Sequence, residues 1–388
     1  MKRIILAGGG HGHINILKEL INNPTVDYEI HLITDFNKQY YSGMLPGFVE
    51  GIYKEEEISF DVKNLCEKAG VNYINEKIIK IDSDEKSVST ILMDDYIEIK
   101  EKPSSYKEKW YLENKSKINT YEFDFISMNL GSYSKKYFPI DSRNSRYVKP
   151  ICEIVDFKNL LDTKEHFIDK LTFKEMIIIG SGASAIELAI SINIKYPNIN
   201  VKIISSSKEL ACRFNKGSKG KLREILKAED ISFQLNEDLI DVDRKNKRIK
   251  TDKGSYSYDY LIISSGIEAC DIEYKGYETT EDNYILVDDK LCANNFSVCM
   301  GDMICLKSNP NIPKVGVFAL RQAPILFKNL INMLNNKEPQ YKYTPQKKYL
   351  QILNCGSQKA IINYGNLSIY GRLAWMLKDH IDKKYMNV

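Results

Sequence analysis

Apolar and polar positions at the start of the chain predict a buried strand that turns into a helix. An apolar run over 4–7 stops at three glycines, residues 8–10, and apolar residues then recur at helical spacing over 14–21. A second apolar run over 28–34 ends at Asp35. Such a glycine turn presents a helix N-terminus to a phosphate, and a carboxylate after the next strand accepts ribose hydrogen bonds. The opening segment therefore predicts a dinucleotide-binding unit.

The glycine loop has one unusual position. Gly8 allows the tight turn and Gly10 the close approach of a pyrophosphate, but His13 stands where the Gly-x-Gly-x-x-Gly pattern has its third glycine. His11 and His13 form a His-x-His pair, and without a third ligand nearby we predict no metal site. The residues expected to contact the first nucleotide are Gly8, Gly10, His11, Gly12, His13 and Asp35.

The same order of parts recurs in the second half. A strand over 175–179 leads into Gly180-Ser181-Gly182 and a helix, and 200–207 is typical of the second strand. An antiparallel meander follows in each half, over 77–121 and over 231–257. The closing strands of the two halves end at Gly131 and Gly266. Two dinucleotide units in one chain imply electron transfer between two dinucleotides.

The predicted fold class is α/β, with two Rossmann-like, three-layer ββα dinucleotide-binding domains, antiparallel β-meanders and a small C-terminal segment. The chain has 388 residues and a net charge of +3, which is not the footprint of a nucleic-acid-binding protein. Eight scattered cysteines without a Cys-x-x-Cys pair indicate a reducing cytosol, and the immediate strand leaves no room for a targeting peptide. No apolar run reaches the roughly 20 residues of a membrane helix. We therefore expect a cytoplasmic protein, with any membrane contact peripheral and at the inner face.

Two further segments carry candidate chemistry. The loop over 40–48 follows the second strand, where a dinucleotide fold places the crevice for the reactive ring, although a Gly/Pro loop that caps the core has the same composition. A strand over 295–300 ends in Gly301-Asp302, and Pro313 precedes a helix to about Leu334. Asp302 is placed to bond a ribityl chain, and the helix N-terminus to stabilise a reduced flavin, whereas Gly-Asp alone is also an ordinary turn.

These features resemble the two-dinucleotide flavoproteins of the pyridine nucleotide-disulfide oxidoreductase superfamily over essentially the whole chain. Within it, the sequence is most similar to the type II NADH dehydrogenase-like branch, and to a subgroup also found fused to selenide, water dikinase. The stretches that carry the resemblance are 8–13, 41–47, 315–322 and 371–382. No Cys-x-x-x-x-Cys pair stands at or after the loop over 40–48, where thiol-dependent disulfide reductases carry one, so disulfide reduction through a thiol pair beside the flavin is not expected.

The resemblance implies an FAD-binding domain from 1–150 and 267–335, an NAD(P)H-binding domain over 151–266, and a C-terminal segment, 336–388, over the flavin. In the dehydrogenases this segment contributes to the quinone site and to membrane docking. Gly180, Gly182 and Glu187 are implied to face NADH or NADPH. The remaining residues implied to lie at the cofactors are Ser42, Gly43, Met44, Leu45, Pro46, Gly131, Gly266, Gly301, Asp302, Val317 and Phe318.

The expected function is an FAD-dependent oxidoreductase that passes a hydride from NAD(P)H to flavin and then to an acceptor such as a quinone. One alternative is a sulfide- or selenium-handling flavoenzyme that uses Cys152 and Cys355, and another is a non-catalytic flavin redox sensor. The donor is also open. Residues 205–207 are serines without a carboxylate, and with Arg213 they favour NADP, unless the inserted domain binds nicotinamide poorly.

The tail predicts a helix with an apolar face made by Tyr370, Leu373, Leu377 and Ile381. Arg372, Lys378, Lys383 and Lys384 lie mostly elsewhere. The apolar face is suited to packing on the protein's own body, to a homodimer contact or to a membrane surface.

Overall fold

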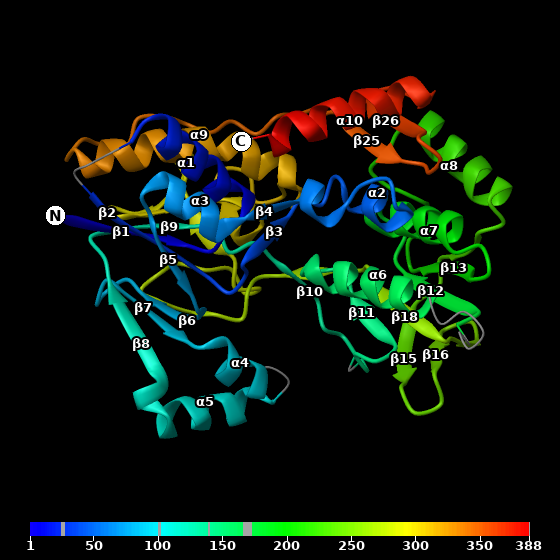
Figure 1. Cartoon of the computed structure of the whole chain (residues 1–388), viewed down its shortest axis with the longest axis horizontal. Helices are drawn as coiled ribbons and strands as arrows, with labels where there is room; N and C mark the ends of the chain where they lie inside the picture. The colour runs from blue at the N-terminus through cyan, green and yellow to red at the C-terminus, as the bar shows by residue number, and fades with distance from the viewer. Residues whose placement is uncertain (25–27, 100–101, 139, 166–172, 388) are drawn as a thin grey trace. The chain divides into compact units, whose positions relative to one another are not determined.

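The structure is a computed structural model that describes residues 1–24, 28–99, 102–138, 140–165 and 173–387. The chain forms two compact units, each assembled from separate stretches (Figure 1). The first unit contains 1–39, 60–132 and 268–345, and the second contains 40–59, 133–267 and 346–388. Residues 40–59 and 133–150 thus group with the second unit, although the sequence analysis expects them in the FAD domain. The division into two nucleotide domains and a tail remains a prediction, and 166–172 and 388 lie outside the described residues.

A six-stranded sheet forms the centre of the first unit, in the order β22-β23-β9-β1-β2-β5. All neighbouring pairs are parallel except β22 and β23. The apolar run that begins the chain is buried in it, with Ile5 fully covered. Helices α1, α3 and α9 cover one face of this sheet (Figure 1). These elements are β1 (Lys2–Ala7), α1 (His11–Asn22), β2 (Tyr28–Thr34), α3 (Val62–Ala69), β5 (Asn72–Asn75), β9 (Phe125–Met128), β22 (Cys292–Asn294), β23 (Ser297–Cys299) and α9 (Gly316–Leu334).

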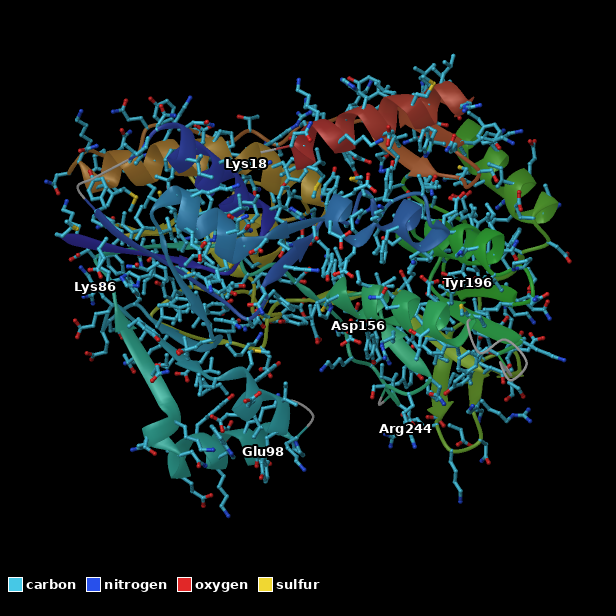
Figure 2. All side chains as sticks on the ribbon, viewed as in Figure 1. Lys18, Lys86, Glu98, Asp156, Tyr196 and Arg244 are labelled. Carbon is cyan, nitrogen blue, oxygen red and sulfur yellow. The ribbon has the colours of Figure 1, made fainter. Side chains whose placement is uncertain are left out.

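A second sheet in this unit has the order β20-β6-β7-β8, in which β6, β7 and β8 form the predicted antiparallel meander. Two helices that the sequence analysis did not predict interrupt it between β7 and β8, and Glu98 of the first is labelled in Figure 2. Ile91, Ile99 and Trp110 give this insertion a small core of its own. The elements are β6 (Lys77–Asp82), β7 (Ser87–Ile91), α4 (Met93–Ile99), α5 (Ser104–Glu113), η2 (Lys115–Lys117), β8 (Ile118–Glu122), β20 (Glu273–Lys275), β21 (Ile285–Val287), η4 (Gly301–Met303) and β24 (Ile304–Leu306).

The second unit repeats the architecture around a parallel sheet in the order β11-β18-β12-β13-β14. The meander β15-β16-β17 is antiparallel but begins at Leu239, because the earlier strand β14 joins the parallel sheet instead. The predicted start of this meander at 231 is therefore wrong. The elements are β10 (Tyr133–Ser134), β11 (Ser145–Tyr147), α6 (Cys152–Glu165), β12 (Glu175–Ile179), α7 (Ala183–Lys195), β13 (Asn200–Ser205), α8 (Lys216–Ala228), β14 (Ser232–Leu235), β15 (Leu239–Asp243), β16 (Arg248–Thr251), β17 (Ser255–Ser257) and β18 (Tyr260–Ile263).

The C-terminal segment of the second unit is an antiparallel sheet, β25-β26-β27, followed by the predicted long helix, which begins at Arg372, so Tyr370 belongs to β27 and not to the helix. Within the described part of the chain, none of the helices combines the length and the apolar character needed to span a bilayer. The predicted α/β class with two Rossmann-like parallel sheets is confirmed. The remaining elements are β3 (Lys38–Tyr40), α2 (Leu45–Glu50), η1 (Glu55–Ile58), β4 (Ser59–Asp61), β19 (Ile267–Glu268), β25 (Gln351–Asn354), β26 (Ala360–Tyr364), β27 (Leu367–Gly371) and α10 (Arg372–Met386).

Candidate nucleotide-binding sites

The first glycine loop is built so that only glycine fits at its turn. Gly8 has φ +92°, and its N–H donates to the carbonyl of Ile33 at 2.8 Å. A Cβ on Gly8 would lie 2.6 Å from the backbone oxygen of Asn129. The turn joins the ends of β1, β2 and β9 and leads directly into α1, so the N-terminus of that helix lies at the carboxyl edge of the sheet. This is the arrangement that holds a pyrophosphate in dinucleotide folds.

Asn129 directly follows β9, and its side chain holds the glycine loop through hydrogen bonds. The sequence did not predict this role. The buried Oδ1 of Asn129 accepts the N–H of Gly12 at 2.9 Å, and its Nδ2 donates to the carbonyl of Met300 at 3.1 Å. A Cβ on Gly10 would collide with this amide. Asn129 therefore ties the glycine loop to the segment that carries Gly301 and Asp302. A polar residue in the apolar closing strand, two positions before Gly131, was the available signal.

His13 supports the loop from inside. Its side chain is fully buried, with Nδ1 2.5 Å from the carbonyl oxygen of Gly8 and Nε2 2.8 Å from the hydroxyl of Ser127 on β9. Burial lowers the pKa of His13 to about 4, so the ring is neutral at physiological pH. The side chain fills the helix–strand contact where the usual pattern has glycine. His11 begins α1 and is half-buried.

Asp35 has a cationic partner that the sequence did not predict. Its Oδ2 lies 2.7 Å from Nζ of Lys77 at the start of β6, and the two side chains are 15% and 9% exposed. Nζ of Lys77 also lies 5.0 Å from the ring centre of Tyr96. A carboxylate held in this way has a fixed orientation at the end of β2, which suits a ribose acceptor.

The Gly301-Asp302 turn lies beside the start of α9. The N–H of Gly301, at φ +83°, donates to Oε1 of Gln322 at 2.8 Å. The hydroxyl of Ser132 donates to Oδ2 of Asp302 at 3.1 Å. Lys314 is another residue that the sequence analysis missed. Burial lowers the pKa of Lys314, and the negative charge of Asp302 opposes that shift. Nζ of Lys314 lies 4.4 Å from the ring centre of Tyr284.

The first unit thus brings together most of the residues predicted for the first nucleotide. Val317 and Phe318 stand in the first turn of α9, and the Phe318 side chain is buried. No atom of the described chain lies within 4 Å of where a Cβ would stand on Gly131 or Gly316. The members of this group are Gly8, Gly10, His11, Gly12, His13, Asp35, Gly131, Gly301, Asp302, Val317 and Phe318.

The second glycine loop has the same geometry in the second unit. Gly180 has φ +119°, and its N–H donates to the carbonyl of Ile204 at 2.8 Å, as Gly8 does to Ile33. A Cβ on Gly180 would collide with the backbone oxygen of Ser264. Gly182 directly precedes α7, and no described atom lies within 4 Å of where its Cβ would stand. The repeat seen in the sequence is therefore present in the backbone hydrogen bonds.

Glu187 lies on α7 against the C-terminal segment. It accepts the backbone N–H of Asn354 at 2.7 Å. Burial raises the pKa of Glu187 to about 7, although Lys378 opposes the rise. Gly266 has φ +67° after β18, in the position that Gly131 has after β9.

The loop with Ser42, Gly43, Met44, Leu45 and Pro46 is in the second unit, where the tail helix holds it. Nζ of Lys378 contacts the carbonyl of Gly43 and lies 2.5 Å from Oδ2 of Asp382, with both side chains buried. The hydroxyl of Tyr41 donates to Oδ1 of Asp382 at 3.1 Å. Lys378 is thus buried away from the exposed apolar face of the tail helix, and the sequence did not predict that burial. Met44 and Leu45 are buried in the core of this unit.

The two cysteines of the sulfur hypothesis differ in environment. None of the cysteines in the described part of the chain forms a disulfide. Burial, and then the Glu187 carboxylate, hold the pKa of the Cys355 thiol well above its ordinary value. Cys152 is half-buried at the start of α6. A thiol that stays protonated is a poor nucleophile, so Cys355 does not favour the sulfide or selenium alternative.

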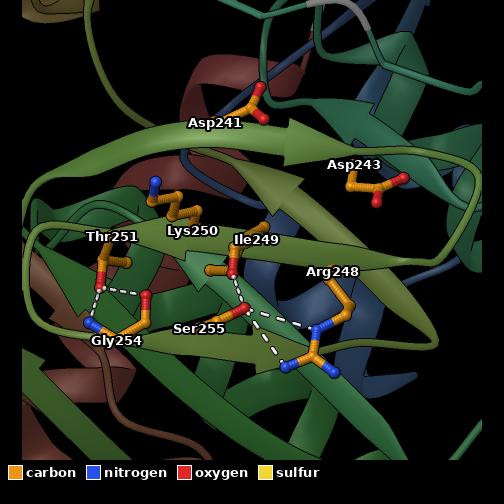
Figure 3. Close-up of a pocket in the computed structure, with 8 residues that line it drawn as sticks. All are labelled: Asp241, Asp243, Arg248, Ile249, Lys250, Thr251, Gly254 and Ser255. Carbon is orange, nitrogen blue, oxygen red and sulfur yellow. Dashed lines mark hydrogen bonds between the residues drawn. The ribbon is translucent and has the colours of Figure 1, made fainter.

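A separate pocket of about 580 Å³ lies over the meander β15–β17 (Figure 3). The hydroxyl of Ser255 donates to the carbonyl of Ile249 at 3.0 Å and accepts from the Arg248 guanidinium at 3.4 Å. Asp241, Asp243 and Lys250 also line it, and the lining contains none of the residues predicted for a nucleotide.

Comparison with known proteins agrees with this geometry. Residues 2–323 match the family model described as "Pyridine nucleotide-disulphide oxidoreductase". Ferroptosis suppressor protein 1 of Taeniopygia guttata is 24% identical over 208 residues, which are 50% of this chain and 54% of that protein. The chain thus spans about half the length of this curated relative.

Solved structures share the fold over nearly the whole chain. The NADH complex of the type II NADH dehydrogenase of Plasmodium falciparum has a TM-score of 0.78 at 14% identity, with 99% of this chain and 96% of that chain covered. The sulfide:quinone oxidoreductase of Aquifex aeolicus has a TM-score of 0.74 at 17% identity, with 99% and 90% covered. The resemblance inferred from the sequence is confirmed at the level of the superfamily fold.

Proposed function

Because the chain belongs to the pyridine nucleotide-disulphide oxidoreductase family, we propose that it transfers electrons from a nicotinamide nucleotide through FAD to a quinone at a membrane surface. The chain is an oxidoreductase with FAD as its cofactor and NADH or NADPH as its donor. The observation that carries the proposal is the duplicated glycine turn, in which Gly8 and Gly180 make the same backbone hydrogen bond, 2.8 Å long, to the second strand of their units.

The residues of the first unit fit FAD. The space beside Gly131 and Gly316 is free of described atoms, as a phosphate or ring that approaches the backbone requires. Asp35, oriented by Lys77, is placed to hold the adenosine ribose, and Asp302 to bond the ribityl chain. Bound FAD supplies the chemistry that accepts a hydride and passes electrons on. The protein holds the ring, and the 19-residue helix α9 directs its N-terminal N–H groups toward developing negative charge.

We assign the second nucleotide to the second unit, where Gly180 and Gly182 would receive the pyrophosphate at the start of α7. Glu187 on the same helix is engaged by β25, so its proposed part is to fix α7 against the C-terminal segment. None of these residues has to exchange a proton during hydride transfer, because the two cofactors make and break the bond.

The C-terminal segment is the part of the chain that we propose to contact the membrane and the quinone. The predicted apolar face of α10 is exposed, with Leu373 at 79%, Leu377 at 41% and Ile381 at 40%, and Met376 at 53% extends it. Large apolar side chains gathered on one helix face mark an interaction surface. A quinone is dissolved in the bilayer, and one of the similar structures is a sulfide:quinone oxidoreductase, whose name includes a quinone. We therefore propose peripheral attachment at the cytoplasmic face.

Anaerobic mixing tests the redox assignment. The purified protein is expected to be yellow, to bleach when NADH or NADPH is added, and to recover its colour when a soluble quinone follows. A colourless protein that does not take up added FAD would overturn the flavin site. A yellow protein that neither nucleotide bleaches would support the redox-sensor alternative instead.

Vesicle binding tests the α10 surface. The double substitution Leu373→Lys and Met376→Lys is expected to lower co-sedimentation with neutral phosphatidylcholine vesicles about tenfold, since two exposed apolar side chains no longer enter the lipid. Leu112→Lys is the matched control, because Leu112 is 69% exposed on α5 of the other unit. Unchanged vesicle binding with loss of a dimer in light scattering would assign this face to a second copy of the chain.

A further inference from the structure

The two nucleotide units differ at one equivalent position. The N–H of Gly8 donates to the carbonyl of Ile33, and the N–H of Gly180 donates to the carbonyl of Ile204, each at 2.8 Å. Ile33 and Ile204 are therefore equivalent positions in the second strands of the two units. Asp35 stands two residues after Ile33, and the residue two after Ile204 is Ser206. The first unit thus has a carboxylate where a ribose is held, and the second has an exposed hydroxyl. A carboxylate at this position repels a 2′-phosphate, and a serine does not.

The side chains around Ser206 present positive charge. Ser206, Lys208 and Arg213 are exposed, and within the described chain their side chains form no hydrogen bond or ion pair. Ser205 is not available to a ligand in the same way, because its buried hydroxyl is bonded to that of Ser181 at 2.9 Å. The exposed hydroxyl and the two cations are therefore the groups that this edge of the sheet offers to a nucleotide.

The nearby carboxylates have other partners. Oε2 of Glu209 lies 2.5 Å from Nζ of Lys219 on α8. Glu237, whose N–H donates to the carbonyl of Ser205, accepts the hydroxyl of Thr251 at 2.5 Å. Among the residues that directly follow β13, Lys208 and Arg213 are therefore the exposed charges, because Glu209 is paired with Lys219 and Glu237 is buried.

Arg213 is carried by a loop with a fixed backbone. Leu210, Ala211 and Phe214 are buried in the core of the second unit. The N–H of Ala211 donates to the carbonyl of Ser181 in the glycine loop at 2.8 Å, and that of Phe214 donates to Ala211 at 2.7 Å. Arg213 thus stands two residues from a direct bond to the segment that would hold the pyrophosphate. A guanidinium on such a loop is suited to bidentate contact with a phosphate.

We propose that Ser206, Lys208 and Arg213 form a subsite for the 2′-phosphate of NADPH, and that the enzyme selects NADPH over NADH. The inference rests on the proposed function, because it assigns the donor to the second unit. The proposed subsite narrows the choice of electron donor from NADH or NADPH to NADPH. The hydroxyl of Ser206 would donate a hydrogen bond to a phosphate oxygen, and the two cations would balance the charge of the dianion.

Stopped-flow reduction of the holoenzyme measures the selection. The efficiency of flavin reduction is expected to be at least about tenfold higher with NADPH than with NADH, and Arg213→Ala to lower it about 10- to 100-fold for NADPH alone. Ser206→Asp is expected to reverse the preference, because it restores the carboxylate of a ribose site. Arg244→Ala is the matched control, since Arg244 is an exposed arginine in the turn after β15 (Figure 2).

Calorimetry with 2′,5′-ADP separates this inference from the redox assignment. The wild-type protein is expected to bind 2′,5′-ADP at least about tenfold more tightly than 5′-AMP, and Arg213→Ala to remove the difference. If neither nucleotide reduces the flavin but this difference is present, the proposed function fails and the subsite stands. If both nucleotides reduce the flavin equally and Arg213→Ala leaves their ratio unchanged, the subsite is refuted and the redox function stands.

Discussion

Gly182→Val is expected to yield a folded, yellow protein whose flavin is reduced by NADH or NADPH at least about 100-fold less efficiently than in the wild type. The reason lies in the surroundings of this glycine. No described atom stands within 4 Å of where its Cβ would be, so a side chain is accommodated by the protein itself. A pyrophosphate at the start of α7 needs that same space. Valine would therefore exclude the nucleotide without disturbing the core.

The measurement is anaerobic stopped-flow absorbance, with far-UV circular dichroism to verify the fold. Gly220→Val is the matched control, because Gly220 is an exposed glycine in α8 of the same unit and also has no described atom within 4 Å of its Cβ position. Its flavin should be reduced at the wild-type rate. Reduction of the Gly182→Val protein within twofold of wild type would contradict the placement of the donor at this loop.

Comparing Gly182 with Gly10 shows what the glycine pattern in the sequence predicts and what it does not. Both glycines precede a helix after a buried strand, and both follow from a pattern of neighbouring residues. Sequence predicts the turn in each case because strand, glycine and helix signals are local. It does not predict that Gly10 faces the Asn129 amide whereas Gly182 faces open space. That difference depends on residues more than one hundred positions away in the first unit.

The same separation accounts for the site residues that the sequence analysis missed. Lys77 was predicted only as part of a meander strand, and its ion pair with Asp35 bridges two strands of different sheets. Lys378 was placed away from the apolar face of the tail helix, but its burial against Asp382 and the Gly43 carbonyl was not predicted. Helical periodicity does not show which charged residues a buried ion pair brings into the core.

For His13, the sequence predicts the local pattern but not the distant partner. Its position was correctly identified as the departure from the glycine pattern, but its role depends on Ser127, which joins the site only through the pairing of β1 with β9. In the neutral ring, Nδ1–H donates to the Gly8 carbonyl and Nε2 accepts the Ser127 hydroxyl. Both ring nitrogens are thus used inside the protein, which makes the loop sensitive to protonation.

The first unit is therefore expected to lose about 3 kcal/mol of stability as the pH falls from 6.5 to 4. The folded-state pKa of His13, about 4, lies below the unfolded value of 6.5. The unfolded chain consequently binds the extra proton first, so the stabilisation is complete above pH 6.5 and disappears through this window. Urea unfolding at several pH values measures it, with Trp110 fluorescence of the first unit recorded in a Trp375→Phe background.

The contribution of His13 is isolated by comparison with His13→Gln, which has a donor and an acceptor in its side chain but does not titrate. The difference between the two unfolding free energies is expected to change by about 3 kcal/mol between pH 6.5 and 4, whatever the carboxylates of the chain contribute to both proteins. His380→Gln is the matched control, since His380 is exposed on α10 of the second unit, and it should follow the wild-type curve. Parallel curves for wild type and His13→Gln would show that the His13 ring is not held neutral in the folded loop.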